Sequence, residues 1–406
     1  MSDGALLETG EPLEYNPFLP DVHEDPYPLY DRLRAEDPVH WNTPGIWILT
    51  RYADAARMLR HPRMSSDFRN SELFQAFREM SGQAQLDERE PSMLFRDPPD
   101  HTRLRGLVSK AFTAKVIDGM RAHIREVVDA LLDGVGERGQ MDVVADLAAP
   151  LPVIVICELL GVPEEDHARF AGWSADLVHT LDPMVGMDVI ERANASAVAF
   201  DQYFIELIAE RRATPRDDLL SALIAAEEEG STLTQEELLT TLILLLVAGH
   251  ETTVNLISNG TLALLRNPDQ LARLRAEPGL LKGAVEELLR FDSPVQLTGR
   301  IALEDMEFGG KLVRAGQQVV ALVGAANRDP AQFSDPGRLD LGREESRHVA
   351  FGGGVHFCLG ASLARAEGQA AIGAMLARFP GLEAAGRPEW RETITLRGLR
   401  SLPVSL

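Results

Sequence analysis

The sequence predicts one large, mainly α-helical domain with a small β part, spanning residues 1–406. Three observations support this fold class. Apolar residues recur at three- and four-residue spacing, the helical period, near 117–133, 188–212, 234–265 and 359–378. Runs typical of strands are confined to two short regions. No tandem repeat, low-complexity tract or Gly/Ser linker divides the chain.

The N-terminal region is expected to be loop-like. Five prolines (Pro12, Pro17, Pro20, Pro26 and Pro28) oppose a continuous helix in the first 30 residues. Residues 1–25 should therefore form an extended N-terminal wrap that is not a separate domain. A hairpin should follow, with strands at Pro38–Trp41 and Ile46–Leu49 around the turn residues 43–45.

Helices should dominate from about Tyr52. The segment 64–97 is the least regular and mixes polar with Met and Phe residues, which is typical of a lid or binding loop; a short helix packed on the core fits equally well. Residues 295–323 should return to strands, most clearly at Val319–Val323. Residues 325–350, rich in Pro, Asp and Gly, should form an irregular meander.

Charge and cysteine content narrow the function classes. With 62 acidic and 40 basic residues the net charge is −22, which disfavours nucleic acid or an anionic membrane as the main partner. Two cysteines, Cys157 and Cys358, are too few for a disulfide framework. The N-terminus lacks a basic signal-like start, and the apolar run Leu238–Ala248 is shorter than the roughly 20 residues of a membrane span. We expect a soluble cytoplasmic protein.

Cys358 stands in a glycine-rich loop, Phe351–Gly360, directly before a predicted helix. Three consecutive glycines suit a tight turn or a close approach. The free N–H groups and the dipole of the following helix favour a thiolate, and an anionic sulfur is a soft ligand for iron or another transition metal. The alternative is a buried structural cysteine, which is how we interpret Cys157 in its apolar run.

The most apolar predicted helix carries polar residues at its centre. Thr252 can donate a hydrogen bond to the carbonyl oxygen of Ala248, and Gly249 weakens the same turn. A broken turn beside the Glu251 carboxylate would let water, dioxygen and protons pass. A kinked core helix with a satisfied threonine is the alternative.

A third pattern is Glu287 and Arg290 in the predicted helix 280–291. An acid and a base three residues apart share one helix face. Taken alone, such a pair most often means a weak surface ion pair.

Together, in this order, the three patterns resemble those of the cytochrome P450 haem-thiolate monooxygenases of the soluble bacterial type. The family's cysteine signature, F-x-x-G-x-x-x-C-x-G, is matched by Phe351, Gly354, Cys358 and Gly360. Its E-x-x-R motif is matched by Glu287 and Arg290. Its A-G-x-[DE]-T motif is matched by Ala248, Gly249, Glu251 and Thr252. The resemblance extends from about Pro17 to the C-terminus.

The resemblance implies the cytochrome P450 fold and a b-type haem with Cys358 as the axial thiolate ligand of the iron. The residues implied to bind the cofactor are Ala248, Phe351, Gly354 and Gly360, and for the haem propionates the cationic partners His101, Arg105, Arg300 and His356. Arg103, two residues from Arg105, is expected at the surface.

The resemblance also assigns roles within the helices. Glu251 and Thr252 are implied to be an acid–alcohol pair that relays protons for dioxygen activation, with Glu251 rotating between solvent and site. Glu287 and Arg290 are implied to form a structural ion network, with Arg338 as its third member.

The implied reaction inserts one oxygen atom from O2 into a hydrophobic small molecule, by hydroxylation or epoxidation, in secondary metabolism. Electrons would come from NAD(P)H through a ferredoxin reductase and a ferredoxin, and a monomer is expected. The ferredoxin would bind a cationic patch made of Arg103, Lys110, Arg347 and Arg365. The implied substrate pocket comprises the loop 64–95, the segment 170–190 with Met184 and Met187, Leu244, Val247, Val295–Leu297 and Leu396–Leu399.

Three alternatives come from other classes. A haem-thiolate enzyme that uses peroxide, or rearranges an oxidised substrate, has less need of the Glu251–Thr252 pair. A non-catalytic haem sensor has less need of that pair or of the long loop 64–97. A helical binding protein without a cofactor leaves the glycine-rich Cys358 loop unexplained.

Overall fold

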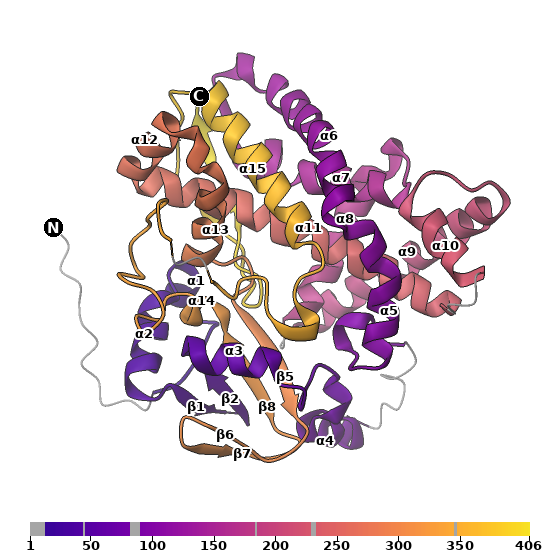
Figure 1. The fold of residues 1–406 in the computed structure, drawn as a ribbon, viewed down its shortest axis with the longest axis vertical. Helices are drawn as coiled ribbons and strands as arrows, with labels where there is room; N and C mark the ends of the chain where they lie inside the picture. The colour runs from indigo at the N-terminus through magenta and orange to yellow at the C-terminus, as the bar shows by residue number, and fades with distance from the viewer. Residues whose placement is uncertain (1–12, 44, 82–89, 183–184, 229–232, 345–346) are drawn as a thin grey trace.

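The computed structural model describes residues 13–43, 45–81, 90–182, 185–228, 233–344 and 347–406. Helices fill most of the molecule, and a five-stranded sheet lies at one end beside α2 (Tyr27–Glu36) and α3 (Tyr52–Arg60) (Figure 1). This confirms the predicted fold class, mainly α with a small β part.

The long helix α11 (Gln235–Arg266) runs through the core. Its start is fixed by a capping box, in which the Thr234 hydroxyl accepts from the Glu237 N–H and the Glu237 carboxylate accepts from the Thr234 N–H. By length and composition α11 resembles a membrane span, but two-thirds (67%) of its most apolar stretch is buried inside the protein. A core helix has the same properties.

Other helices pack around α11. They are α5 (Asp100–Val108), α6 (Ala114–Asp133), α7 (Pro150–Leu160), α8 (His167–Val178), α9 (Met187–Ala213), α10 (Leu219–Glu228), α12 (Pro268–Ala276), α13 (Leu281–Phe291) and α15 (Ala361–Arg378). The predicted periodic segments 117–133, 188–212 and 359–378 correspond to three of them, and the predicted helix 280–291 corresponds to a fourth. The first half of α11 contributes to one apolar cluster with α7 to α10, and its second half to another with α6, α13 and α15. Burial along both halves therefore holds α11 in place.

The predicted hairpin is present, with β1 (Val39–Asn42) antiparallel to β2 (Ile46–Leu49). The sheet order is β1-β2-β8-β5-β3, with β8 (Gln318–Leu322) parallel to β2 and antiparallel to β5 (Leu297–Ala302). The edge strand β3 (Met64–Ser65) pairs with β5. Three small sheets complete the β part, formed by β6 (Met306–Phe308) with β7 (Lys311–Val313), β4 (Gln140–Asp142) with β12 (Pro403–Ser405) and β9 (Glu383–Ala384), and β10 (Glu389–Trp390) with β11 (Leu399–Ser401).

The expected loop-like N-terminal region is wrong from Pro20 onward, whereas residues 13–19 contain no helix, as expected. Two helices, α1 (Pro20–Glu24) and α2, begin before residue 30. Each has proline at its first or second position, where the missing N–H would have no intrahelical partner anyway. The prolines therefore start these helices instead of preventing them. The rest of the predicted wrap, residues 1–12, lies outside the described residues, as does the hairpin turn residue Pro44.

The segment 64–97 contains the helix α4 (Glu72–Ser81) between irregular stretches, and residues 82–89 lie outside the described part. The ring of Phe68 lies 4.9 Å from that of Phe74 and 5.7 Å from that of Phe95, centroid to centroid, so aromatic contacts join the two ends of the segment. The predicted meander follows the short helix α14 (Val323–Ala326), and its described residues form few regular elements.

Candidate functional site

The Cys358 loop is shaped by its glycines. Gly352 and Gly354 adopt positive φ angles of 70° and 65°. A Cβ on Gly354 would lie 2.5 Å from the Leu59 carbonyl oxygen of α3, so a side chain there would clash. The Cys358 N–H donates to the Phe351 carbonyl oxygen at 2.9 Å, which closes the loop, and α15 begins three residues later. The local sequence thus fixes Cys358 at the start of a core helix.

Four cationic or imidazole side chains gather beside this loop. His101 and Arg105 come from α5, Arg300 from β5 and His356 from the loop itself. The rings of His101 and His356 lie 4.1 Å apart, and Arg105 donates to the Phe357 carbonyl oxygen at 2.7 Å. The structure therefore brings together all four predicted propionate partners.

Among the described residues no carboxylate forms an ion pair with these four side chains, although the charge of Asp97 acts on Arg300 and His101 from a greater distance. No carboxylate among the described residues lies within ion-pair distance of Arg300, which is buried and donates only to Gly299 and Thr298. Burial lowers the pKa of Arg300 to about 10, and burial together with the charge of Arg300 lowers the pKa of His356 to about 3. His101 Nδ1 and His356 Nε2 are buried without a hydrogen-bond partner. Such a cluster is suited to an anion with several oxygen acceptors.

At the centre of α11, the predicted back-bond is present. The Thr252 hydroxyl donates to the Ala248 carbonyl oxygen at 2.7 Å. The helix is nevertheless continuous over 235–266, so the predicted break in this turn is wrong. Ala248 is exposed and Thr252 is half-buried, although they lie mid-way along a core helix. Because residues four apart share a face, this face of α11 is accessible at its centre rather than packed against other helices.

Glu251 faces elsewhere and is fixed by a residue that sequence reasoning missed. Its side chain is 3% exposed and accepts from Arg391 Nη1 at 2.6 Å. Arg391 directly follows β10 and also donates to the Leu399 carbonyl oxygen at 3.2 Å. Nothing in the sequence links positions 140 residues apart, so this partner could not be predicted. On the same turn, His250 Nδ1 lies 3.0 Å from the Ser174 hydroxyl of α8.

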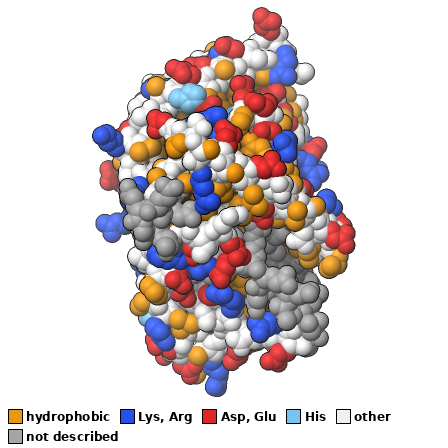
Figure 2. All heavy atoms as spheres, turned by 90° about the vertical axis from the view of Figure 1, so that its right-hand side faces the viewer, with side chains coloured by type: hydrophobic (Ala, Val, Ile, Leu, Met, Phe, Trp, Pro, Cys, Tyr) orange, Lys and Arg blue, Asp and Glu red, His pale blue; other side chains and the backbone are white. Residues whose placement is uncertain are grey.

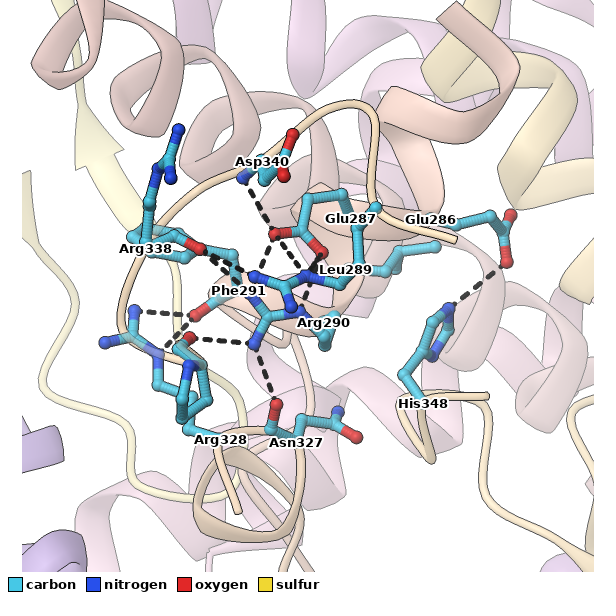
Figure 3. Close-up of polar contacts among 12 residues, drawn as sticks. Glu286, Glu287, Leu289, Arg290, Phe291, Asn327, Arg328, Arg338, Asp340 and His348 are labelled. Atoms are coloured by element: carbon cyan, nitrogen blue, oxygen red, sulfur yellow. Dashed lines mark hydrogen bonds and ion pairs between the residues drawn. The ribbon is translucent and has the colours of Figure 1, made fainter. Parts of the chain in front are cut away.

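The predicted ion network is buried rather than superficial (Figure 3). Arg290 donates through Nε and Nη2 to the two carboxylate oxygens of Glu287, at 2.7 and 2.8 Å, and the two side chains are 1% and 3% exposed. The third member is Arg343, whose Nε lies 3.1 Å from Glu287 Oε2, and not Arg338 as predicted. Arg338 contributes its carbonyl oxygen, and its residue is exposed. Both arginines lie in the irregular meander, where the sequence does not show which side chain turns inward.

Comparison with known proteins identifies the architecture. The family model for cytochrome P450 matches residues 40–390. The chain belongs to the cytochrome P450 family. It is 44% identical to cytochrome P450 107B1 of Saccharopolyspora erythraea, over 98% of this chain and 99% of that one. It is 43% identical to the vitamin D(3) 25-hydroxylase of Pseudonocardia autotrophica, over 99% of this chain and 98% of that one. The solved structure of P450BioI in complex with an acyl carrier protein ligated to hexadec-9Z-enoic acid matches with a TM-score of 0.87 and 41% identity, over 95% of this chain and 99% of that one.

This cytochrome P450 is thus a monooxygenase that acts on small molecules, and members of the family carry a haem whose iron binds a cysteine thiolate. The described site fits that cofactor. Haem propionates are anions, and the underpaired cationic cluster with its two orphaned imidazole nitrogens is built to receive anions. The other cysteine, Cys157, is buried in the core of α7, where burial raises the pKa of its thiol to about 12.

Part of the predicted substrate pocket of this P450 forms one apolar cluster. Val178 of α8, Val247 of α11 and Leu396 of the C-terminal turn are buried together, with Val295 packed against them. Leu244 packs instead in the cluster of α7 to α10. Met187 is 68% exposed, so the structure contradicts its predicted place in the pocket. The other predicted methionine, Met184, lies outside the described residues.

Two of the four side chains in the predicted cationic patch already form ion pairs within the protein. Arg103 lies at the surface as expected, but it pairs with Glu237 at 2.5 Å. Arg365 is held by Glu286 at 2.6 Å. Lys110 and Arg347 are exposed. On the face that carries α9 and α10, basic side chains are interspersed with acidic ones (Figure 2), so no large patch of one sign forms there.

Proposed function

We propose that Cys358 supplies the thiolate that binds the haem iron, and that His101, Arg105, Arg300 and His356 bind the haem propionates. The observation that carries this proposal is the buried, underpaired cationic cluster beside the Cys358 loop. Ala248, Phe351, Gly354 and Gly360 would shape the haem pocket around it. When bound, the haem activates dioxygen, and a thiolate ligand favours cleavage of the O–O bond. Residues 1–406 would act as one haem domain.

Glu251 and Thr252 would deliver the protons that dioxygen activation consumes. The Thr252 hydroxyl can accept a hydrogen bond while it donates its own hydrogen to the Ala248 carbonyl oxygen. To pass on a proton it would release that carbonyl and donate toward the haem side of α11. Glu251 is held on the other side by Arg391. Rotation toward Thr252 must break this buried charge-assisted bond, at a cost of roughly 1–3 kcal/mol. Proton delivery would therefore be gated by the Glu251–Arg391 pair.

We further propose that the substrate is a hydrophobic small molecule, hydroxylated or epoxidised next to the apolar cluster around Val247 and Leu396. The relatives fit this chemistry: one is named for hydroxylating vitamin D3, and another holds a fatty acyl chain on its carrier protein. A role in secondary metabolism, in the cytoplasm and as a monomer, completes the proposal.

Electrons would come from a ferredoxin and its NAD(P)H-dependent reductase. Val355 and Phe357, on either side of His356 in the Cys358 loop, are 53% and 43% exposed, close in sequence to the thiolate. The ferredoxin would contact this apolar centre, with Lys110 and Arg347 contributing charge. Because Arg103 and Arg365 are already paired, the reduction rate should fall only weakly with rising salt. A steep fall would contradict this arrangement.

The reaction is tested with 18O2. The haem-loaded protein, a surrogate ferredoxin with its reductase, NADPH and a panel of terpenoids, steroids, macrolides and fatty acids are incubated together, and products are examined by mass spectrometry. The proposal predicts one 18O atom per product molecule and no product from the Cys358→Ser variant. Faster product formation with hydrogen peroxide alone would instead favour a peroxide-driven enzyme. No oxygen-dependent NADPH consumption with any substrate would favour a haem sensor.

A further inference from the structure

Two adjacent glutamates on α13 point to different parts of the molecule (Figure 3). Glu287 lies within the network of Arg290 and Arg343 that holds the meander. Glu286 turns away from that network, toward His348, which lies three residues before the Cys358 loop. The family motif that Glu287 belongs to does not include Glu286. A separate function for Glu286 is therefore open.

Glu286 makes a two-pronged contact with Arg365, in the second turn of the helix that follows Cys358. Arg365 Nε and Nη2 donate to its two carboxylate oxygens at 2.6 and 2.8 Å. His348 Nε2 lies 3.2 Å from the same carboxylate, and His348 Nδ1 accepts from the Ala350 N–H at 3.2 Å. Since Nδ1 is an acceptor, the proton sits on Nε2 and is donated to Glu286. Glu286 thus joins α13, α15 and the residues before the loop.

Through Arg365, the contact with Glu286 also involves Phe351, the first residue of the cysteine signature. The Arg365 guanidinium lies 4.4 Å from the centroid of the Phe351 ring, within the range of a cation–π contact. The other side chains around this ring include Val285 and Leu289 of α13. The backbone of Phe351 in turn accepts the hydrogen bond from the Cys358 N–H. A side chain that fixes the Phe351 ring therefore fixes the anchor of Cys358.

The electrostatics agree with a tight contact. Burial alone would raise the pKa of Glu286, but the hydrogen bonds from Arg365 and His348 lower it to about 2. The carboxylate is thus charged at neutral pH. The pair is only partly exposed, at 29% for Arg365 and 20% for Glu286, so solvent screens it incompletely.

We propose that Glu286, Arg365 and His348 form a brace that holds Phe351 and thereby keeps the Cys358 loop in its haem-binding conformation. Glu286 and Arg365 are positioning residues in this account, because neither is the ligand itself. The brace also explains why Arg365 is unavailable to a ferredoxin. The inference rests on the proposed assignment of Cys358 as the iron ligand.

The test compares Glu286→Gln, Arg365→Gln and the double variant with the unmodified haem-loaded protein. Arg378→Gln is the matched control, because Arg378 also lies on α15 and pairs with a carboxylate of a neighbouring helix, Asp133 of α6, but at the far end of α15. Three quantities are measured: haem transfer to excess apomyoglobin, the absorption spectrum of the reduced carbon monoxide complex, and amide hydrogen exchange of peptides covering 348–358 and α9.

Each brace variant should lose haem about tenfold faster, the usual effect of breaking a charge-assisted bond. Each should also show a larger share of the non-thiolate carbon monoxide complex and faster exchange in 348–358 but not in α9. The double variant should be no worse than Arg365→Gln, because the two residues act through one contact. Arg378→Gln should match the unmodified protein.

The inference would be overturned by brace variants that behave like the unmodified protein, by equal effects of Arg378→Gln, or by faster exchange throughout the chain. The last two outcomes would mean a general loss of stability. A wrong ligand assignment has a different signature, because the unmodified protein would then lack the thiolate-type carbon monoxide spectrum.

Discussion

The buried carboxyl group of Glu367 should make the stability of this P450 depend on pH. It lies on α15 between Cys358 and the C-terminus, faces α11 and is fully buried beside Thr253. Burial raises the pKa of its carboxyl from 4.5 to about 8, although the hydrogen bond with Thr253 opposes the effect. At neutral pH the group is therefore mainly protonated in the folded protein and ionised in the unfolded chain.

Glu367 therefore makes the folded protein less stable as the pH rises. The contribution of Glu367 to stability is fully present below pH 4.5, where both states are protonated, and it is lost progressively as the pH rises toward 8. A change in pKa from 4.5 to about 8 corresponds to at most about 5 kcal/mol, at roughly 1.4 kcal/mol per tenfold change in proton affinity. Relaxation around the carboxylate reduces this, so we expect a few kcal/mol.

The perturbation is Glu367→Gln, which keeps the shape and cannot ionise. Urea unfolding of the haem-loaded protein and the variant is followed by circular dichroism at pH 5 and pH 8. The variant should gain stability relative to the unmodified protein between these values. Glu383→Gln, at an exposed position of β9, controls for the change in net charge. A stability difference between the Glu367→Gln variant and the unmodified protein that is the same at both pH values would refute the reasoning.

Three further predictions concern the site and its supports. Thr252→Ala should divert reducing equivalents to hydrogen peroxide while changing the free energy of unfolding by less than about 1 kcal/mol, since only one half-buried back-bond is lost. Thr252→Ser should retain coupling of NADPH consumption to product. The amounts of product, consumed NADPH and peroxide, measured together, test both expectations. Arg300→Gln should weaken haem retention about tenfold yet leave the haem-free chain no less stable, because it removes an unpaired buried charge. Haem transfer to apomyoglobin measures the retention, and urea unfolding measures the stability of the haem-free chain. A destabilised haem-free chain would contradict the prediction. Arg343→Met should lower the free energy of unfolding by about 3 kcal/mol because it leaves Glu287 underpaired, whereas Arg338→Met should lower it by less than about 1 kcal/mol. Equal losses of stability in urea unfolding would contradict the assignment of Arg343 as the third member of the network.

Much of the fold could be predicted because local pattern and local structure coincide. The periodic segments became α6, α9, α11 and α15, and the hairpin around residues 43–45 formed as expected. The prediction failed where one residue type has two meanings. Proline is well suited to the first turn of a helix, so Pro20 in α1 and Pro28 in α2 were misread as helix breakers.

The site could be predicted where its members are close in sequence. The glycines before a predicted helix pointed to the Cys358 loop, and four-residue spacing predicted the Thr252 back-bond. The distant partners His101, Arg105 and Arg300 were implied only by the family resemblance. Contacts between distant segments could not be found this way. Arg391 reaches Glu251 across 140 residues, and the choice of Arg343 over Arg338 depends on which side chain of an irregular segment turns inward. Pairing to nearby carboxylates likewise removed Arg365 from the expected docking patch.

The central claim is that Cys358 is the thiolate ligand of a haem held by the cationic cluster. The most direct measurement is the absorption difference spectrum of the reduced protein with and without carbon monoxide. The account predicts the strongly red-shifted Soret band of a thiolate-bound haem, and its loss in the Cys358→Ser variant. A band at the position typical of histidine or neutral thiol ligation in the unmodified protein, or a thiolate-type band that survives Cys358→Ser, would contradict it.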